Sequence, residues 1–270
     1  MHFIFYIYLI NTVLSSPSLP DGLKLVFEDN FEGGTINRDL WDVECYVDHP
    51  EVLNLNNDGD YKLKEGESCS SKLSNGCNKD LQLPIISGKI HSKLNSGFRY
   101  GRFEMRAQLP IGNYLWPTFW LLPVTDKYGT WPTGGEIDIL EAKGHMKDKV
   151  EFTLHHGGKW PNNQYFTTPH MKNGLFDGYH TFGIDYTKNY IKFFIDDNYV
   201  HNVELNRDWS TAFHQYNGMG IPFIDQEWYM IIDLAIAGNY FGPGWKFDKY
   251  NDPKSWKQNF NIDFVKVYQF

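Results

Sequence analysis

The sequence has no run of basic residues. It carries 25 Lys and Arg residues against 33 Asp and Glu residues, which gives a formal net charge of −8 at pH 7. Proteins that bind nucleic acid or an anionic membrane surface normally concentrate positive charge on one face. The composition therefore gives no electrostatic reason to expect nucleic acid or membrane as a partner.

Cysteine is scarce as well. The three cysteines, Cys45, Cys69 and Cys77, fit neither a zinc-binding spacing nor a Cys-x-x-Cys redox pair. In an oxidising compartment a disulfide between Cys69 and Cys77 could close the polar loop that separates them, and Cys45 would stay free. Cys45 could also pair with either of the other two.

Long hydrophobic runs are absent apart from one at the N-terminus, from Met1 to Ile10. This run is shorter than the roughly 20 apolar residues that span a bilayer, and it is followed by small and polar residues. Ser15, with Val13 two positions before it, suits signal-peptide cleavage. We therefore expect residues 1–15 to be a signal peptide and the mature chain to be extracellular, with no membrane anchor.

Long helical periodicity is absent too, and short alternating segments rich in β-branched and aromatic residues take its place. Many short strands predict one all-β domain over residues 16–270, as a β-sandwich or barrel. The turn-rich stretches 48–67, 161–178 and 206–224 are expected to be excursions from it. The predicted strands are Leu23–Phe27, Ile85–Leu94, Arg99–Leu109, Trp116–Leu122, Glu136–Ala142, Val150–Leu154, Tyr179–Tyr186, Tyr190–Ile195, Tyr199–Leu205, Glu227–Ala237 and Ile262–Tyr268.

Aromatic residues, in contrast, are abundant at 17% of the chain, with nine Trp and 17 Tyr. Aromatic side chains pack well on pleated sheets, so many of them belong in a β-rich core. Others could line a groove that binds the flat apolar faces of sugars. The two interpretations are compatible.

The segment from Gly134 to Ala142 carries the strongest chemical signal, because three carboxylates alternate with Ile and Leu. On a strand, Glu136 and Asp138 share one face, and plain alternation would turn Glu141 into the core. Burying an unpaired carboxylate is costly, which favours a bulge near residues 139–140 that returns Glu141 to the acidic face.

Three carboxyls on one wall of a groove suit glycoside hydrolysis with retention, in which one carboxylate attacks and a second carboxylic acid donates the proton. Crowding and burial separate their pKa values, and Asp138 can hydrogen-bond to a neighbouring carboxyl. The simpler alternative is an edge strand whose acids face water. Trp116 and Trp120 lie four residues apart on the preceding strand, so they share a face and could support a glucosyl ring.

The run from Trp116 to Glu141 resembles glycoside hydrolase family 16, especially animal laminarinases and the β-1,3-glucan-binding proteins related to them. The motifs are Trp-Pro-x-x-Trp-Leu-Leu-Pro and Tyr-Gly-x-Trp-Pro-x-x-Gly-Glu-Ile-Asp-Ile-Leu-Glu. Further likeness extends over segments 100–110, 154–158, 225–229 and 262–268.

The resemblance implies a jelly-roll sandwich whose concave sheet forms the substrate cleft. By position, Glu136 would be the nucleophile, Glu141 the acid/base and Asp138 their helper. Family members often hold a structural calcium, for which Glu28 and Asp263 are the candidates here, and no cofactor is required for the reaction. The residues implied to bind substrate are Trp116, Trp120, Trp131, His155 and Lys89.

Two departures from the family pattern bear on the substrate. The stretch 45–51 replaces a motif that usually contributes to the cleft, and Lys89 stands where laminarinases tend to carry Arg. For His155 the alternative role is a hydrogen bond at a strand end. The expected function is that of an endo-β-1,3-glucanase, monomeric, with β-1,3-glucan as its partner. The alternative is a protein that binds the same glucan without cutting it, although binders of this kind typically lack one or both glutamates.

Overall fold

The computed structural model describes residues 3–4, 8–9, 22–32, 36–46, 85–159, 163–196, 198–205, 222–242, 246, 248, 251–257 and 259–270. Cys69, Cys77, nearly all of the expected signal peptide and the stretch 48–67 lie outside the described residues, so the expectations for them stay predictions. The side chain of Cys45 is not described either. No helix in the described ranges has the length and apolar character that crossing a bilayer would need.

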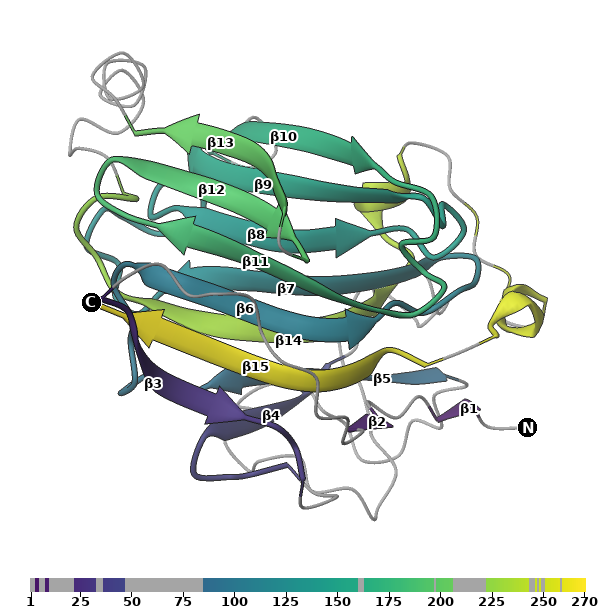
Figure 1. Cartoon of the computed structure of the whole chain (residues 1–270). Helices are drawn as coiled ribbons and strands as arrows, with labels where there is room; N and C mark the ends of the chain where they lie inside the picture. The colour runs from purple at the N-terminus through teal and green to yellow at the C-terminus, as the bar shows by residue number, and fades with distance from the viewer. Residues whose placement is uncertain are drawn as a thin grey trace.

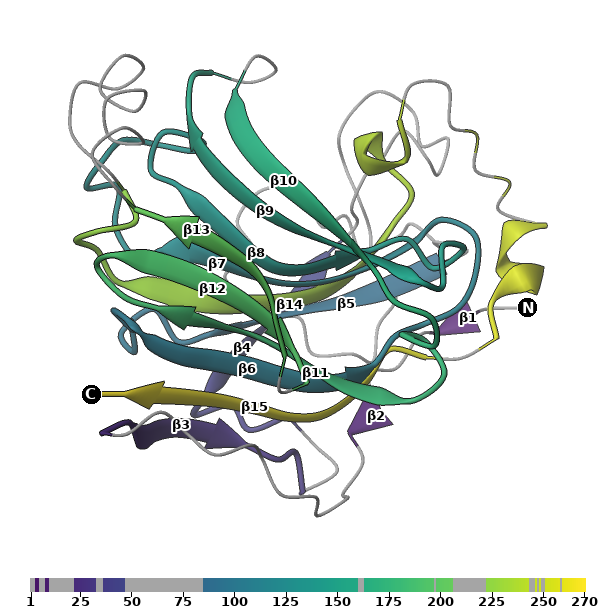
Figure 2. The ribbon, with the colours of Figure 1, turned by 45° about the horizontal axis from the view of Figure 1, so that its top comes forward.

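Two antiparallel-dominated sheets form the molecule, and Figures 1 and 2 show them as two layers. The first sheet has the order β1-β5-β14-β7-β8-β9-β10, with β4 paired to β5. Its strands are β1 (Phe3–Ile4), β4 (Trp41–Tyr46), β5 (Ile85–Ser92), β7 (Leu115–Pro123), β8 (Glu136–Ala142), β9 (Lys149–Gly157), β10 (Gln164–Met171) and β14 (Trp228–Ile236).

The second sheet has the order β13-β12-β11-β6-β15-β2, with β3 paired to β15. Its strands are β2 (Tyr8–Leu9), β3 (Lys24–Asp29), β6 (Gly101–Gln108), β11 (Tyr179–Tyr186), β12 (Tyr190–Ile195), β13 (Asn198–Glu204) and β15 (Asn261–Gln269). Two short 3-10 helices, η2 (Asn239–Phe241) and η3 (Asp252–Ser255), precede β15.

The core lies between the sheets because one face of each strand is apolar. Phe119 and Leu121 of β7 are fully buried, and so are Phe103 and Met105 of β6 in the opposite layer. Each such side chain stabilises the fold by about 1.5–3 kcal/mol. One face of β7 and β8 packs into this core, so their other face is available for a binding site. The predicted all-β sandwich is confirmed.

Each predicted strand is present, with ends that differ by a few residues, but four strands escaped prediction. β10 (Gln164–Met171) lies inside the stretch 161–178, which we expected to leave the scaffold, and that expectation was wrong for these residues. β10 pairs along its whole length with β9 and forms the edge of the first sheet. The other omissions were β4 and the two-residue strands β1 and β2.

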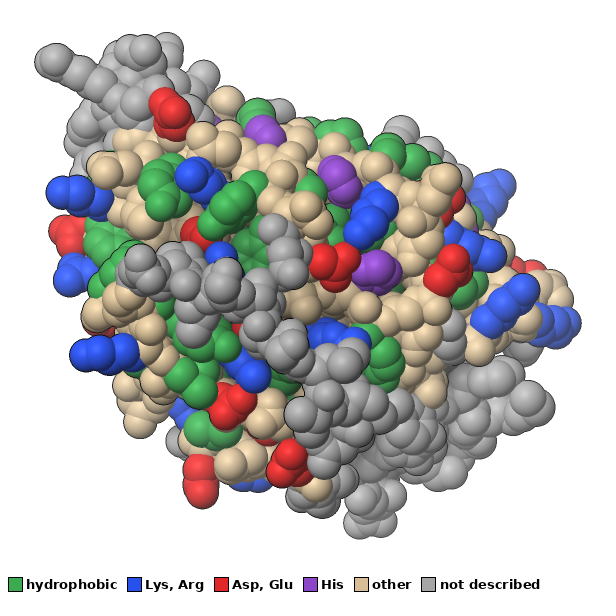
Figure 3. Space-filling view, in the orientation of Figure 1, with side chains coloured by type: hydrophobic (Ala, Val, Ile, Leu, Met, Phe, Trp, Pro, Cys, Tyr) green, Lys and Arg blue, Asp and Glu red, His purple; other side chains and the backbone are tan. Residues whose placement is uncertain are grey.

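The outer surface of the second sheet, seen in Figure 3, carries no field of one charge sign among its described residues. Acidic, basic and hydrophobic side chains are interspersed over it. This agrees with a chain whose acidic and basic residues are mixed along the sequence. The described part of this face therefore offers no positive surface of the kind that a polyanion needs.

Candidate active site

The β8 strand is bulged, as its sequence predicted. Asp138 pairs with Trp120 of β7 while Leu140 pairs with the preceding Phe119, so Ile139 is an extra residue with no partner in β7. Towards β9 the pairing likewise skips residues 139 and 140. Ile137, Ile139 and Leu140 are all fully buried in the core. The extra residue therefore returns Glu141 to the side of Glu136 and Asp138.

All three carboxyls line one pocket of about 330 Å³ on the outer face of the first sheet. Its floor comes from alternate residues of β7, which share that face. Trp116 and Trp120 are among them, so the predicted shared face is confirmed. The residues that line the pocket are Trp116, Thr118, Trp120, Leu122, Trp131, Glu136, Asp138, Glu141, Asp233 and Ala235.

Glu136 and Asp138 form a hydrogen-bonded pair. Burial, followed by the charges of Glu136 and Glu141, raises the pKa of Asp138 well above its ordinary value. Burial raises the pKa of Glu136 to about 7, against the opposing effect of hydrogen bonds from Asp138 and Trp131. The indole Nε1 of Trp131 lies 2.5 Å from Glu136 Oε2. Burial and the neighbouring carboxylates therefore favour the protonated form of Asp138, whose O–H can donate to Glu136.

Glu141 has a different environment. Burial raises its pKa to about 7, a hydrogen bond from Thr153 opposes that rise, and the negative charge of Glu151 adds to it. Thr153 Oγ1 lies 2.7 Å from Glu141 Oε2 and 3.1 Å from Thr167 Oγ1. Glu151 lies directly opposite Glu141 across the β8–β9 pairing. The two glutamates thus have separate hydrogen-bond partners, but burial raises the pKa of each to about 7, so the expected separation of their pKa values is not seen.

His155 stands opposite Glu136 across the same strand pair, so the structure places it where the sequence predicted. Its Nε2 is 3.7 Å from Glu136 Oε1 and 3.6 Å from Asp138 Oδ2. Burial, with a smaller effect of His156, lowers its pKa to about 4. The ring is therefore neutral at pH 7. Asn163 Nδ2 lies 3.0 Å from its Nδ1, which fixes the ring orientation.

The two tryptophans of β7 are held by partners that the sequence analysis did not identify. Trp120 Nε1 donates to Asp233 Oδ1 over 2.8 Å, and Lys89 Nζ lies 5.6 Å from the centre of the Trp120 ring. Lys89 is not among the residues that line the pocket. Trp116 stacks on Tyr240 of η2, with ring centres 4.5 Å apart and planes at 21°.

Tyr240 is anchored in turn, because its hydroxyl donates to Glu151 Oε2 over 2.6 Å. Lys149 pairs with the other oxygen of Glu151, also at 2.6 Å. This chain of contacts, from Lys149 through Glu151 and Tyr240, holds the Trp116 ring in place. Asp233, Tyr240 and Glu151 were missed in the sequence. An acid inside the apolar run Met230–Ile236 was the one signal that could have pointed to Asp233.

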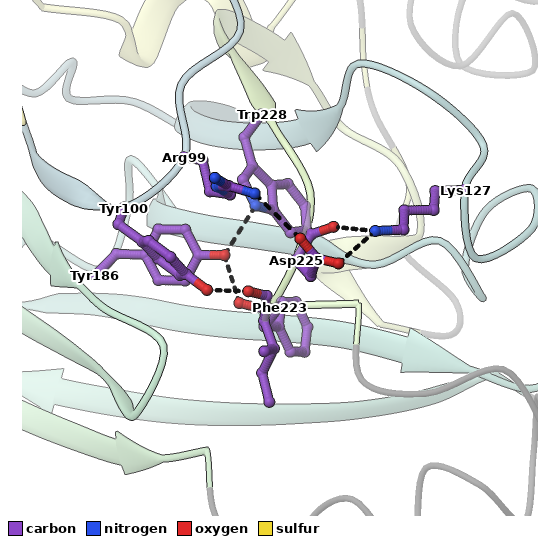
Figure 4. A network of polar contacts seen from close by, with 8 residues as sticks. Arg99, Tyr100, Lys127, Tyr186, Phe223, Asp225 and Trp228 are labelled. Atoms are coloured by element: carbon purple, nitrogen blue, oxygen red, sulfur yellow. Dashed lines mark hydrogen bonds and ion pairs between the residues drawn. The ribbon is translucent and has the colours of Figure 1, made fainter.

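A polar network fixes the segment that precedes β14 (Figure 4). Asp225 pairs with Arg99 at 3.1 Å and with Lys127 at 2.6 Å, and the Tyr186 hydroxyl donates to the carbonyl of Phe223. From this segment the buried Gln226 donates through Nε2 to the carbonyl oxygen of Gly134 over 2.7 Å. The network thereby supports the turn that leads directly into Glu136.

Gly135 is the hinge of that turn. Its φ of 94° lies in the region that favours glycine, and an added Cβ would lie 3.0 Å from both Pro222 and Trp228. A side chain here would push the start of β8 away from the network. The two glycines before Glu136 thus let the strand begin close against the 222–228 segment.

The two residues suggested for calcium each form an ion pair within the second sheet. Glu28 Oε1 accepts from Lys266 Nζ at 3.0 Å, and Asp263 pairs with Arg106. Each carboxylate is thus already neutralised by a cation of its own sheet, and the calcium expectation stays a prediction. Among the described residues, one group of acids and histidine has metal-like spacing, Glu136, Asp138 and His155, and it is the catalytic-type cluster itself.

Comparisons with known proteins agree on one family. The family model described as glycosyl hydrolases family 16 matches residues 53–228. A glucan endo-1,3-beta-glucosidase of Cryptopygus antarcticus is 33% identical over 259 residues, which cover 90% of each chain. Glucan endo-1,3-beta-glucosidase A1 of Niallia circulans is 30% identical over 92% of this chain, and the chain spans only 38% of that protein's length.

A relative of a different kind matches at a similar level. A beta-1,3-glucan-binding protein of Penaeus monodon is 32% identical, over 81% of this chain and 76% of its own. Among solved structures, a laminarinase of Flavobacterium sp. UMI-01 is 30% identical and superposes with a TM-score of 0.65, over 91% of this chain and all of that one. Relatives named as glucanases and a relative named as a glucan-binding protein therefore match this chain at similar levels of identity.

Proposed function

The chain belongs to glycosyl hydrolase family 16, and from that premise we propose that it is a secreted endo-β-1,3-glucanase that acts with retention of configuration. The observation that carries the proposal is the joint placement of Glu136, Asp138 and Glu141 in one pocket. Glycan hydrolysis by double displacement needs a nucleophilic carboxylate and a protonated carboxylic acid on the same cleft wall. The bulge in β8 supplies both from a single strand.

In this mechanism Glu136 attacks the anomeric carbon while Glu141 gives its proton to the departing glycosidic oxygen. A covalent glycosyl–Glu136 ester forms, and the C–O bond to the leaving sugar breaks. Glu141, now ionised, then takes a proton from water, whose oxygen displaces Glu136. Asp138 supports the ionised form of Glu136 before its attack and again as it departs, because its O–H donates to that carboxylate.

The substrate assignment rests on the aromatic lining and on the relatives. Trp116 and Trp120 on the floor of the pocket, with Trp131 at its side, offer flat apolar surfaces for pyranose rings. Both glucosidase relatives named above act on β-1,3-glucan by name. These two observations together favour a β-1,3-linked glucan over other polysaccharides.

A second candidate function is glucan recognition without cleavage. It is favoured by one observation, the 32% identity to the beta-1,3-glucan-binding protein of Penaeus monodon. Against it stands the complete set of carboxyls, since a binder has no need to keep three raised-pKa acids buried together. The two functions differ in a single measurable outcome.

That outcome is the release of reducing ends from laminarin, curdlan and lichenan by the purified mature chain. We expect release from the β-1,3-linked glucans by the wild type, and a loss of at least about 10³-fold in Glu136→Gln and in Glu141→Gln. Glu204→Gln, an exposed change of the same kind on β13, serves as the control with full activity. Laminarin bound but not cut by the wild type would decide for the recognition protein.

Secretion is the part of the proposal that depends on residues 1–15. Expression of the full chain in a secreting eukaryotic host should yield protein in the medium whose first residue is Ser16. Retention of the whole N-terminus on protein inside the cells would contradict it.

A further inference from the structure

Three aromatic rings form a row that leads away from the pocket across neighbouring strands. Trp131, which precedes β8, lines the pocket and donates to Glu136. The ring of His155 on β9 lies 5.8 Å from that of Trp131, and the ring of Tyr165 on β10 lies 5.6 Å from that of His155 at an angle of 33°. The row therefore joins the reacting carboxyls to the edge of the sheet.

The register of β10 places Tyr165 on the same face as the pocket. Tyr165 pairs with His155, and Thr167 pairs with Thr153, which contacts Glu141. Phe166, between them, faces the other sheet, where its ring stacks on that of His201 at 5.4 Å. Phe166 is itself 39% exposed, so it lies at the rim of the sandwich, and Tyr165 points to the opposite side of β10, the outer face.

Tyr165 is 62% exposed, although it is a large aromatic side chain on an edge strand. β10 is the last strand of its sheet, as Figure 2 shows. A single exposed aromatic ring is common on a protein surface, so the exposure of Tyr165 alone does not indicate a site. Its continuity with the pocket through Trp131 and His155 points to ligand binding.

We propose that Tyr165 forms a sugar-stacking site that extends the cleft across β9 onto β10, for a glucosyl unit beyond those held in the pocket. The proposal rests on the proposed function, because the occupant is the same β-1,3-glucan chain. β10 lies two strand spacings, about 9–10 Å, from the strand of Glu136 and Glu141. The unit on Tyr165 is thus separate from the unit that is attacked.

The chemistry of the row suits a pyranose ring. One face of a β-glucosyl unit presents C–H groups, which pack on an aromatic face while the tyrosine hydroxyl stays in water. His155 between the two larger rings is neutral at pH 7, so a sugar that covers it does not bury a charge. Asn163 contacts the His155 ring from the β9–β10 connection and so holds it in place beside Tyr165.

The test measures binding by calorimetry in the Glu136→Gln background, with β-1,3-linked gluco-oligosaccharides from the disaccharide to the heptasaccharide. Addition of Tyr165→Ala should weaken the longest oligosaccharides by about 3- to 10-fold, the equivalent of one aromatic contact, and leave the shortest binder unchanged. Tyr165→Phe should bind like the parent at every length. Met171→Ala, equally exposed at the far end of β10, is the matched control.

Equal affinities of Tyr165→Ala and its parent at all lengths would overturn this site and leave the proposed function standing. A parent that binds none of the oligosaccharides would remove both, and an equal loss for short and long ligands would place Tyr165 in the pocket instead. A melting temperature within a degree or two of the parent's shows that the ring was removed without unfolding.

Discussion

At the scale of single residues, the most consequential pair is Glu141 and Glu151. The two carboxyls lie opposite each other on β8 and β9, and the charge on Glu151 adds to the raised pKa of Glu141. Glu151 itself stays ionised because Lys149 and Tyr240 stabilise its charge, which lowers its own pKa. Glu151 therefore acts on the reaction through the proton of Glu141, without being a catalytic residue.

This arrangement predicts the pH profile of Glu151→Gln. Loss of the negative charge should lower the pKa of Glu141, so Glu141 loses its proton at lower pH. The alkaline limb of kcat/KM for laminarin should then move to lower pH by roughly 0.5–1 unit, with the acidic limb in place. Glu204→Gln carries the same charge change on the other sheet and should leave both limbs unmoved. An alkaline limb that shifts upward would contradict the role given to Glu151.

A second prediction concerns stability. The folded-state pKa of Glu136 is about 7, above its ordinary value of 4.5, so the folded state holds this proton more tightly than the unfolded chain does. That contribution is full below pH 4.5 and is lost as the pH rises through 7. The amide of Glu136→Gln stays neutral at every pH, so the variant does not lose this stabilisation. It should therefore be more stable than the wild type at pH 8, by on the order of 2 kcal/mol.

The measurement is thermal or urea unfolding of both proteins from pH 4 to pH 8. The difference in unfolding free energy should be near zero at the acidic end and grow towards the alkaline end. A variant that is less stable than the wild type at pH 8 would show that Glu136 is stabilised by its partners and not strained by burial.

At the scale of elements, the bulge in β8 decides whether the site exists. Ile139 and Leu140 both face the core, and this doubling is what returns Glu141 to the face of Glu136. In a regular strand the period of two would place Glu141 in the apolar layer. A regular strand of this same sequence would therefore bury the charge of Glu141, whereas the bulged strand presents Glu136 and Glu141 on one face.

Deletion of Ile139 tests this directly. Without Ile139, plain alternation leaves Glu136, Asp138 and Glu141 on the outer face and Ile137 and Leu140 in the core. The variant should therefore fold and retain measurable hydrolysis, at a rate lowered by the changed spacing of the carboxyls. Ile139→Val keeps the strand length and should cost only about 0.5–1.5 kcal/mol, with activity retained. A folded deletion variant with no hydrolysis at all would contradict the claim that the bulge serves to return Glu141 to the face of Glu136.

The strands differ in how well the sequence predicted them. Strands with one buried face, such as β11 and β12, were predicted to the residue because alternation is strong when half the side chains enter a core. β10 was missed because most of its residues are exposed and it contains Pro169. As an edge strand it needs fewer apolar side chains, so its pattern resembled that of a loop.

The site was predictable to the extent that it is local. Glu136, Asp138 and Glu141 share one strand, so their spacing and the cost of burial were enough to predict the bulge. Asp233, Tyr240 and Glu151 reach the pocket or its supports from β14, η2 and β9. These residues meet only through the pairing order of the sheet, which alternation along one segment does not determine.

At the scale of the whole molecule, the two faces of the first sheet have different roles. The inner face packs on the second sheet, and the outer face holds acids, aromatic platforms and, in our proposal, the edge tyrosine Tyr165. A long polymer that crosses strands of one sheet can be held at several units while one bond is presented to Glu136 and Glu141. This is the geometry expected for cleavage within a chain.

The central assignments are Glu136 as the nucleophile that attacks the anomeric carbon and Glu141 as the acid that supplies the proton. The direct test is proton NMR of the anomeric region during the first minutes of laminari-oligosaccharide hydrolysis by the wild type, before mutarotation. Two displacements at the same carbon predict that the β-anomer appears first and the α-anomer grows in later. An α-anomer released first would mean a single displacement by water, and Glu136 would not be the nucleophile.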